Sequence, residues 1–572
     1  MHRPTHRLFR ILFVIMSWKT SAVTIRVPED YPTIQAGLNH ASEGDTVLVA
    51  DGTYLENLIW PDTPDITLRS YTNCNSTQIS GHGLGPVIRM NAVPSASISG
   101  FTLRDGVPVD SRNGGGVSAY DSGFTISDCC IRDNTANDSW GGGGVYVKNG
   151  QVTVCACMFE QNRAGNAAVG SAMAIDNTVA VIQDSFFIAN EDPISFSGVL
   201  SVEYASPEIL RNVFAYNPGS GICLWDGGGV IRDNLFFENA VQGINSFDAR
   251  SVVIENNLFD GNSVQGIFLY HRYASSRISG NTVAGSQTGV HIINYSSSLE
   301  IDHNIITGNG TGIELQYGNP LTVFNNDTWG NIRDFQGLDD PTGMDGNISL
   351  DPLFCLGPFG SYFLSQEQAG QEETSPCVDA GSGSAIPEDR TTRTDLVPDN
   401  GVRDIGYHYP LEASPGIPTP HPTQTPAPPT PTPPPPTISQ TPNPSWTPTP
   451  TGTPTAGPFA PRIEILLNST MFQSGDRFNF DIRIENNSQF IMLHCFVLLD
   501  AYGSIWFWPS WTQSVDYETW AIPAVTSALF PILKFTWPDD AGAADGLKFW
   551  AALTSLDWMT IVSLDSEEWG YR

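Results

Sequence analysis

The chain has 572 residues, enough for several domains, and its 60 acidic residues against 27 basic ones give a net charge of −33 at pH 7. A nucleic-acid-binding protein needs a basic face, and this composition offers none, so that class of function is excluded. Hydrophobic residues make up 40% of the chain and aromatic residues 10%, which is enough apolar material for buried cores and excludes general disorder.

The N-terminus has the pattern of a secretion signal. A basic start is followed by an apolar run over residues 11–18 and by the small residues Ser21 and Ala22. We predict a signal peptide over residues 1–22 and a mature chain that is secreted or held at the cell surface, in an extracellular or periplasmic setting. The apolar run is too short to span a bilayer, and no other run is long enough, so we expect no transmembrane span in the mature chain.

A repeated segment runs through the middle of the chain. Short apolar stretches such as LFFEN and LFDGN recur every 22 to 28 residues and end at one residue type, asparagine, with one serine variant. These end positions are Asn134, Asn162, Asn190, Asn217, Asn239, Asn262, Ser286 and Asn309. A period of this length that tolerates small insertions indicates a solenoid.

Each repeat predicts three short strands with turns between them. After an opening glycine, as in GICLWD from Gly221, apolar residues alternate with others at the period of two that a strand requires. A parallel β-helix has this composition, whereas the leucine ladder and the helical period of other solenoids are absent. We expect the repeated asparagines to stack in a hydrogen-bonded ladder at a turn. A second ladder of buried aromatic rings is expected from Phe159, Phe187, Phe214, Phe236 and Phe259.

Residues 33–57, TIQAGLNHASEGDTVLVADGTYLEN, and the later segments DPLF, SPCVDAG and DIGYHY carry a family resemblance. Over residues 24–410 the chain resembles the right-handed parallel β-helix proteins of the pectin-lyase-like superfamily. The resemblance implies an N-terminal helix that plugs the open end of the solenoid, and Ile34, Leu38 and Ala41 would form its buried face with Thr33 as its cap. The superfamily holds lyases, hydrolases, esterases, epimerases and adhesins, so the resemblance implies a fold and leaves the activity open.

Two further units follow the solenoid, which we place at residues 23–413. Residues 414–461 contain 19 prolines and no charged side chain, which predicts an extended Pro/Thr-rich linker. Residues 462–572 alternate as strands, which predicts a small antiparallel β-sandwich and an all-β protein overall. The sandwich is rich in tryptophan, and either these rings fill its core or some of them form an exposed sugar-binding platform; they are Trp506, Trp508, Trp511, Trp520, Trp537, Trp550, Trp558 and Trp569.

The candidate site was sought by column, because equivalent residues of successive coils stack about 4.8 Å apart. The fifth place after the opening glycine holds Asp121, Asn149, Asp176, Glu203, Asp226, Asp248, His271, Asn294 and Tyr317. The preceding place holds the aromatic residues Trp225, Phe247 and Tyr270, a candidate sugar-stacking strip. Arg272 follows His271 and is one of the few bases nearby.

Three interpretations of the column remain open. Asp and Asn at strand ends favour turns, so the column has a purely structural explanation. Close carboxylates also suit Ca²⁺, the one cofactor we consider, and the predicted ligands are Asp176, Glu203, Asp226 and Asp248. Adjacent carboxylates suit glycosidase chemistry as well, and the catalytic candidates are Asp226, Asp248, Arg272 and His271.

The nine cysteines, an odd number, fit an exported protein with a few disulfides and at least one free thiol. Cys129 and Cys157 occupy the same place in adjacent coils, within disulfide distance. Cys355 and Cys377 lie in the C-terminal closing segment and form a second possible pair.

The sequence therefore predicts a secreted or cell-surface β-helix protein, expected to be a monomer, that binds extracellular polysaccharide or a surface glycan. One alternative is a Ca²⁺-dependent polysaccharide lyase, similar to pectate lyases, or a glycoside hydrolase, although no complete catalytic motif of the superfamily is present. A second alternative is a structural or adhesive surface protein.

Overall fold

The computed structural model describes residues 22–411 and 461–571, with internal gaps at 109–113, 137–140, 166–168, 192–197, 273–274, 296–297, 384–388, 400, 470, 474–475, 487–490, 502–503, 508–517, 523–525, 537–543 and 555–560. The predicted signal peptide and the predicted linker lie outside the described residues, apart from one residue at an edge of each.

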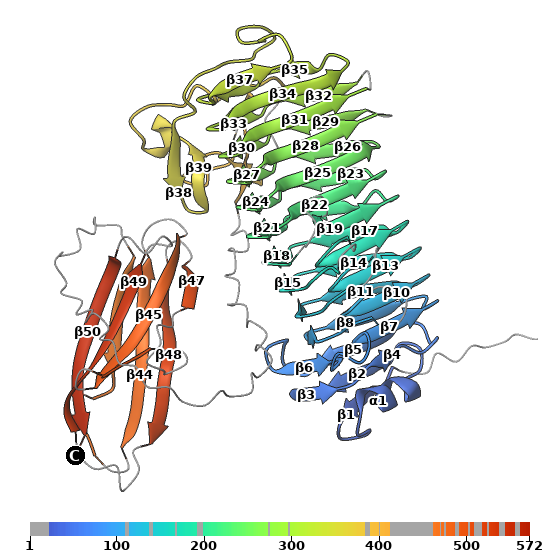
Figure 1. Cartoon of the computed structure of the whole chain (residues 1–572), viewed down its shortest axis with the longest axis vertical. Coiled ribbons are helices and arrows are strands. Elements are labelled where there is room, and N and C mark those ends of the chain that lie inside the picture. Colours follow the sequence, from blue (N-terminus) through green and yellow to red (C-terminus); the bar gives the residue numbers. More distant parts are fainter. Residues whose placement is uncertain are drawn as a thin grey trace, which may run out of the picture.

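The N-terminal part of the chain is a right-handed parallel β-solenoid, as predicted (Figure 1). Each coil contributes one strand to each of three long parallel sheets, and the coils stack in chain order. The first sheet contains β1 (Thr24–Val27), β2 (Thr46–Val49), β5 (Ile66–Ser70), β8 (Ala96–Ser99), β11 (Gly123–Ser127), β14 (Gln151–Cys155), β17 (Val179–Gln183), β20 (Glu208–Leu210), β23 (Gly229–Arg232), β26 (Val252–Glu255), β29 (Ser276–Ser279), β32 (Leu299–Asp302) and β35 (Thr322–Phe324).

The second sheet is made of the shortest strands. They are β3 (Gly52–Leu55), β6 (Thr77–Ser80), β9 (Thr102–Arg104), β12 (Cys130–Arg132), β15 (Met158–Glu160), β18 (Phe186–Ile188), β21 (Val213–Ala215), β24 (Leu235–Phe237), β27 (Leu258–Asp260), β30 (Thr282–Ala284), β33 (Ile305–Thr307) and β36 (Asp327–Trp329).

The third sheet carries the candidate site, and its strands lengthen from β19 onward. They are β4 (Leu58–Ile59), β7 (Ile88–Asn91), β10 (Val117–Tyr120), β13 (Val145–Lys148), β16 (Met173–Asp176), β19 (Gly198–Glu203), β22 (Ser220–Trp225), β25 (Gln242–Ala249), β28 (Gln265–His271), β31 (Thr288–Asn294), β34 (Thr311–Gly318) and β37 (Arg333–Gln336).

Apolar and amide side chains stack along the axis of the solenoid. The predicted phenylalanine ladder is confirmed: the five rings are fully buried and successive centroids lie 4.6 to 5.0 Å apart. The predicted asparagine ladder is confirmed as well, since Asn134 Nδ2 donates to Asn162 Oδ1 at 3.0 Å and the pattern repeats along the coils. Each amide also bonds to backbone, so the ladder satisfies the buried polar groups of the turns.

A second asparagine ladder, not predicted, lies at the other end of the second sheet. It joins side chains through the same amide-to-amide bonds: Asn212, Asn234, Asn257, Asn281, Asn304, Asn326 and Asn347. The signal in the sequence was an asparagine five residues before each member of the first ladder from Asn217 onward, as in Asn234 and Asn239. The short strands of this sheet are thus bounded by amide ladders on both sides.

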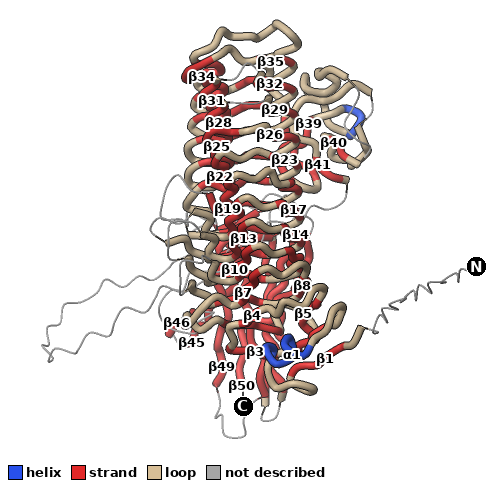
Figure 2. Tube along the Cα trace, turned by 90° about the vertical axis from the view of Figure 1, so that its right-hand side faces the viewer, coloured by secondary structure: helices blue, strands red, loops and turns tan. Residues whose placement is uncertain are grey.

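The N-terminal end is covered by helix α1 (Ile34–His40), as the resemblance implied (Figure 2). Thr33 Oγ1 accepts a hydrogen bond from Ala36 N at 3.1 Å and caps the helix. Ile34, Leu38 and Ala41 are buried against the first coils, which confirms the predicted apolar face.

A closing segment, residues 350–411, turns back along the outside of the later coils. It contains β38 (Phe354–Gly357), β39 (Gly360–Leu364), the 3₁₀ helix η1 (Glu367–Ala369), β40 (Arg390–Thr391) and β41 (Tyr409–Pro410). Arg390 Nη1 forms a 2.7 Å ion pair with the buried Asp233, and Asn256 Nδ2 donates to the carbonyl oxygen of His408 at 3.0 Å. These contacts join positions about 150 residues apart in the chain.

The cysteine pairs differ from those considered from sequence. The disulfide joins Cys74 to Cys130, and the other seven cysteines are free thiols. Cys129 precedes the disulfide-bonded Cys130 in the chain, and its own thiol packs in the core beside Cys157. Cys377 Sγ donates to Asp327 Oδ2 at 3.1 Å rather than pairing with Cys355.

The C-terminal part contains two small sheets, described here by themselves. One holds β42 (Arg462–Leu467), β44 (Arg477–Asn486) and β48 (Thr526–Thr536). The other holds β43 (Met471–Phe472), β50 (Ile561–Tyr571), β49 (Ala544–Thr554), β45 (Ile491–Ala501) and β46 (Ser504–Phe507), with β47 (Glu518–Ile522) beside β45.

Side chains of both C-terminal sheets share one core, as expected for a β-sandwich. Trp569 belongs to this core, whereas Trp550 is half-buried with Lys548 Nζ 4.0 Å from its ring centroid. The other six tryptophans singled out from sequence have side chains outside the described set. In the described part of the chain, every helix is too short or too polar to cross a membrane.

Candidate functional site

The outer face of the third sheet has two neighbouring rows of residues where the sequence predicted one. The strand-end row, set by the pairing of the strands, is Tyr120, Lys148, Asp176, Glu203, Trp225 and Phe247. The turn row follows one residue later and consists of Asp121, Asn149, Asn177, Tyr204, Asp226 and Asp248. Every member of the turn row has a left-handed φ between 47° and 53°.

The predicted acidic column is therefore a mixture of the two rows, which corrects the sequence interpretation. Asp176 and Glu203 lie in the strand-end row, and Asp226 and Asp248 lie in the turn row. The reason is that Asp176 and Glu203 are the last residues of their strands, whereas Asp226 comes one residue after Trp225. Asp and Asn tolerate the left-handed conformation that this turn requires, so the turn row has the structural role considered above.

Asp176 and Glu203 form the pair of neighbouring carboxyl groups in the strand-end row. They are paired residues on adjacent strands, and Lys148 Nζ donates to Asp176 Oδ2 at 2.5 Å from the next strand. Burial raises the pKa of the Glu203 carboxyl, the negative Asp176 raises it further, and Lys148 lowers it. The buried Tyr146 lies beside them, and burial together with nearby acidic groups raises the pKa of its phenol. The cluster thus holds one carboxyl group paired with a lysine and a second carboxyl group, Glu203, whose pKa is raised.

Asp226 and Asp248 each have a cation of their own. Arg250 Nε lies 3.1 Å from Asp226 Oδ1, and Arg272 Nε lies 3.2 Å from Asp248 Oδ1. Arg272 also donates to the Tyr270 hydroxyl at 2.5 Å and lies over the ring of that tyrosine.

The four predicted calcium ligands are thus split between two rows, and three of them face a cation of the chain. Such an arrangement does not fit one oxygen-lined Ca²⁺ site. Within the described residues, the only three His, Cys or acidic side chains whose ligand atoms all lie within 4.8 Å of one another are Asp399, Asp404 and His408, in the closing segment.

His271 lies on the core side of the third sheet, which corrects its placement among the catalytic candidates. Its side chain is fully buried, and its Nδ1 is 3.3 Å from Asn294 Oδ1 on the next strand. Burial lowers the pKa of the imidazole. The alternation of β28 explains this position, because His271 follows the inward Ile267 and Leu269 at a period of two. A side chain with no exposed atoms cannot contact a polymer on the outer face.

An aromatic strip crosses the outer face of the third sheet. The rings of Trp225 and Phe247 are stacked, with centroids 4.5 Å apart and an interplanar angle of 18°. The strip continues through Phe268 at 5.6 Å and His291 at a further 5.2 Å. All four side chains are half-buried.

Tyr270 was predicted to continue this strip and does not. A bulge between Ser246 and Ala249 places two residues of β25 opposite one residue of β28, so Tyr270 is displaced towards the turn row. There it contacts Arg272 and, edge to face, Tyr295. Phe268 and His291 were not predicted as members of the strip, because they lie two residues earlier in their strands than the predicted column. The signal in the sequence for Phe268 was an aromatic residue two places before Tyr270.

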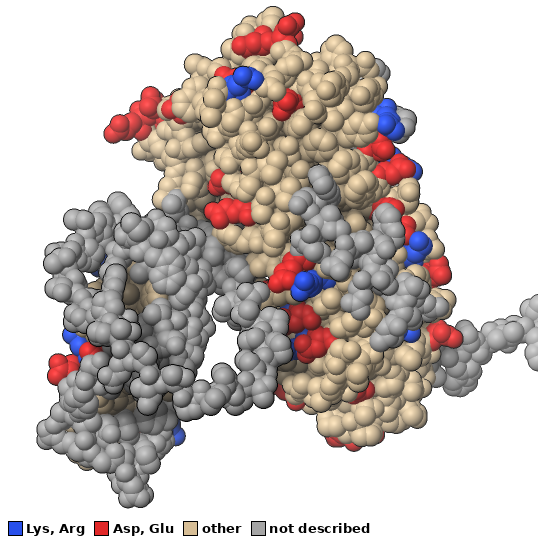
Figure 3. All heavy atoms as spheres, in the orientation of Figure 1, with Lys and Arg blue, Asp and Glu red and all other residues tan. Residues whose placement is uncertain are grey.

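Uncharged atoms make up most of the described solenoid surface in Figure 3, and acidic and basic side chains are scattered over it. In this view the basic side chains are few and lie among acidic ones.

A hollow lies elsewhere, at the C-terminal end of the solenoid. Its volume is about 1130 Å³, and its lining includes Leu315, Leu321, Val323 and Leu338. It is the place where the next coil would stack, so its apolar walls are the uncovered end of the core, and none of the predicted site residues line it.

Comparison with known proteins supports the fold. The family described as "Right handed beta helix region" matches residues 168–299 and 272–343. A comparison with curated protein sequences finds no match.

Several solved structures are similar to parts of this chain at low identity. The PL6 family alginate lyase AlyGC has 16% identity and a TM-score of 0.36, over 64% of this chain and 59% of that one. The catalytic unit of a GH87 α-1,3-glucanase from Streptomyces thermodiastaticus has 12% identity and a TM-score of 0.31, over 57% of this chain and 69% of that one. The sporulation control protein Spo0M from Bacillus subtilis has 11% identity and a TM-score of 0.14, over 20% of this chain and 49% of that one.

The chain thus spans about half the length of Spo0M and 59% of the length of the alginate lyase. With the three stacked sheets, the matched region and the capping helix in place, the chain is a right-handed parallel β-helix protein that resembles the pectin-lyase-like superfamily.

Proposed function

We propose that this chain is an exported protein that binds an extracellular polysaccharide across the outer face of the third sheet. The observation that carries the proposal is the stacked pair Trp225 and Phe247, which lies beside the polar cluster of Asp176, Glu203 and Lys148. Flat aromatic faces pack against the apolar faces of sugar rings, and adjacent carboxylate and ammonium groups bond to sugar hydroxyls. Successive coils repeat such contacts along one direction, which suits a linear polymer.

The net charge of −33 restricts the class of polysaccharide that we expect the protein to bind. A strongly acidic protein repels a polyanion unless cations bridge the two, so we favour a neutral glycan. Calcium is not part of the proposal on this face, because Lys148, Arg250 and Arg272 already neutralise three of the four carboxylates.

The test is binding of a panel of neutral and uronic oligosaccharides by titration calorimetry, with calcium and with a chelator. Trp225→Ala is expected to weaken binding of the recognised glycan about fivefold, since the loss of an aromatic contact of about 1 kcal/mol corresponds to that factor. Tyr71→Ala is the matched control, because Tyr71 is an aromatic residue that is 70% exposed away from this face.

Binding that survives Trp225→Ala unchanged would move the contact surface elsewhere. Failure of the wild-type protein to bind any glycan in the panel would favour the structural or adhesive alternative.

A second candidate function, glycoside hydrolysis, is favoured by one specific observation. Asp176 and Glu203 are paired on adjacent strands, the pKa of Glu203 is raised, and Asp176 forms an ion pair with Lys148. A strand spacing of about 4.8 Å is near the 5–5.5 Å separation of the two carboxyl groups in retaining glycosidases.

Glu203→Gln is the variant that separates binding from hydrolysis. It is expected to keep glycan binding and to abolish the release of reducing ends, because glutamine keeps the shape of the side chain and cannot deliver the proton. Reducing-end and unsaturated products would be followed together, since an unsaturated product would indicate a lyase. Product formation unchanged in Glu203→Gln would remove this residue from the chemistry.

A further inference from the structure

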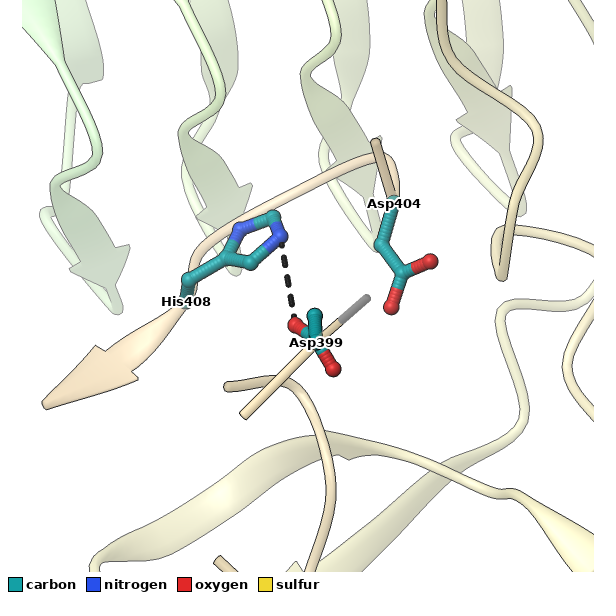
Figure 4. Close-up of side chains that lie close together, drawn as sticks. All are labelled: Asp399, Asp404 and His408. Carbon is teal, nitrogen blue, oxygen red and sulfur yellow. Dashed lines mark ion pairs between the residues drawn. The ribbon is translucent and has the colours of Figure 1, made fainter. Parts of the chain in front are cut away.

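The closing segment contains three ligand-type side chains that meet in its interior. Asp399, Asp404 and His408 come from separate stretches of the segment and converge (Figure 4), with all ligand atoms within 4.8 Å of one another. The side chains are 7%, 3% and 0% exposed. None of them belongs to the face that carries the proposed glycan site.

The backbone of His408 is fixed against the solenoid. His408 N donates to Asn256 Oδ1 at 2.7 Å, and Asn256 Nδ2 donates to the His408 carbonyl oxygen at 3.0 Å. The imidazole therefore stands at the junction between the closing segment and the coil that contains β26.

The hydrogen bond of one ring nitrogen fixes the tautomer of His408. Nδ1 lies 2.9 Å from the carbonyl oxygen of Gly406, and because a carbonyl only accepts, Nδ1 carries the proton. Nε2 then presents its lone pair. This atom is buried and has no hydrogen-bond partner among the described residues.

The lone pair of Nε2 faces the Asp399 carboxylate, with Nε2 3.5 Å from Oδ2. This separation exceeds the usual hydrogen-bond distance of about 2.7–3.2 Å, so the buried Nε2 is left without a partner. A buried lone pair aimed at a carboxylate oxygen is unfavourable unless a positive charge lies between them.

Both carboxylates are held in place by neutral donors. Asp399 Oδ2 accepts from Thr392 N at 2.8 Å. Asp404 accepts from Asp379 N at 2.7 Å and from Thr392 Oγ1 at 2.6 Å. These bonds orient the oxygens without neutralising them.

Two of the three arginines of the segment bond to other acids, and the third, Arg403, is buried near His408. Arg390 pairs with Asp233 at 2.7 Å and Arg393 with Asp395 at 2.6 Å, and in the described part of the chain no ion pair joins an arginine to Asp399 or Asp404. The three side chains thus present the oxygens of two carboxyl groups and a nitrogen lone pair to one small space.

We propose that Asp399, Asp404 and His408 bind one divalent transition-metal ion, Zn²⁺ or Mn²⁺, which joins separate stretches of the closing segment where that segment meets the solenoid. Imidazole nitrogen together with carboxylate oxygen suits these ions, whereas Ca²⁺ takes oxygen ligands alone. A metal-binding histidine generally donates its other N–H to a carbonyl or carboxylate, which is what Nδ1 does with Gly406.

The first experiment uses the full chain without an affinity tag. The protein is stripped with a chelator and dialysed, and its uptake of Zn²⁺, Mn²⁺ and Ca²⁺ is measured by elemental analysis and by calorimetry. One equivalent of Zn²⁺ or Mn²⁺ per chain is expected, with little Ca²⁺. At a free metal concentration of 100 times Kd, the ratio of folded to unfolded protein is expected to rise about 100-fold, seen as a higher Tm.

The second experiment uses Asp404→Asn and His408→Gln, with His82→Gln as the matched control because His82 is an exposed histidine outside the cluster. Each cluster variant is expected to lose at least tenfold in metal affinity, and the control is expected to lose none. If a cluster variant does not fold, the absorption spectrum of Co²⁺ bound to the wild-type chain reports whether nitrogen and oxygen ligate the ion.

Two results would overturn the proposal. One is a stripped wild-type chain that takes up none of these ions and keeps its Tm when they are added. The other is equal uptake by Asp404→Asn, which would place the ion elsewhere. Both are independent of glycan binding, so they leave the proposed function untouched.

Discussion

Neighbouring residues at the end of each strand of the third sheet have different roles. Asp226 and Asp248 adopt the left-handed conformation of the turn and pair with Arg250 and Arg272. Trp225, one residue before Asp226, points outward from the strand and stacks on Phe247. A shift of one residue therefore separates a turn former from a surface contact residue.

A buried acid at the end of the solenoid provides a prediction about pH. Asp327 has no exposed surface; its Oδ1 accepts from Leu350 N at 3.1 Å and its Oδ2 accepts from the Cys377 thiol. Burial raises the pKa of this carboxyl from 3.8 to about 6. A folded-state pKa above the unfolded value means that the folded state binds the proton more tightly, so this contribution to stability is complete below pH 4 and is lost as the pH rises through 6.

Asp327→Asn is expected to remove that dependence. Relative to the variant, the wild-type protein should lose up to about 3 kcal/mol of unfolding free energy between pH 4 and pH 7, because each unit of pKa shift corresponds to about 1.4 kcal/mol. Urea unfolding of both proteins at several pH values measures the difference, which also cancels the titration of other groups. Parallel stability curves for the two proteins would show that Asp327 titrates normally.

At the scale of elements, two asparagine ladders hold the short strands of the second sheet. Asn234 donates to the Ile209 carbonyl at 2.9 Å and to Asn257 Oδ1 at 3.0 Å, and its own Oδ1 accepts from Asn212. One side chain thus satisfies buried groups of three successive coils at the end of a strand of only three residues.

Asn234→Ala tests this account. The variant leaves several buried backbone and amide groups without partners, at about 1–3 kcal/mol each, so a loss of about 3 kcal/mol or more in unfolding free energy is expected. Asn91→Ala, at an exposed asparagine of the third sheet, is the matched control and is expected to change stability by less than about 0.5 kcal/mol. Denaturant unfolding measures both, and equal stabilities would mean that water replaces the ladder without cost.

At the scale of the whole solenoid, the two ends differ in how the core is covered. Helix α1 covers the first coil with a capped amphipathic turn, and the last coil leaves an apolar hollow. The closing segment instead returns to earlier coils, where Arg390 reaches the buried Asp233 and Asn256 binds the backbone of His408. The later coils are therefore joined by contacts that are long-range in the sequence.

The variant Arg390→Met measures how much the contact between the closing segment and the earlier coils contributes to stability. Removing the guanidinium leaves Asp233 buried without its cation, which is expected to cost about 3–5 kcal/mol of unfolding free energy and to expose the closing segment to limited proteolysis. Combining it with Asp233→Asn is expected to recover part of the loss, since no uncompensated charge then remains. An unchanged protease pattern in Arg390→Met would mean that the apolar contacts of the segment suffice by themselves.

The sequence by itself determined the solenoid. Its strands, its capping helix and its aromatic and first amide ladders all follow from local patterns repeated every 22 to 28 residues, so one correctly interpreted coil predicts the next. The boundaries of the Pro/Thr-rich linker at 414–461 stay a prediction, as does the signal peptide.

Only the tertiary structure decided which site residues meet. The bulge that displaces Tyr270, the inward side of His271 and the split of the four acids all depend on the register between coils, and a shift of one residue moves a side chain to the other face or to the turn. The meeting of Asp399, Asp404 and His408, and of Arg390 with Asp233, depends on how the closing segment folds back. No local period encodes these contacts, because they arise from packing between positions that the sequence does not repeat.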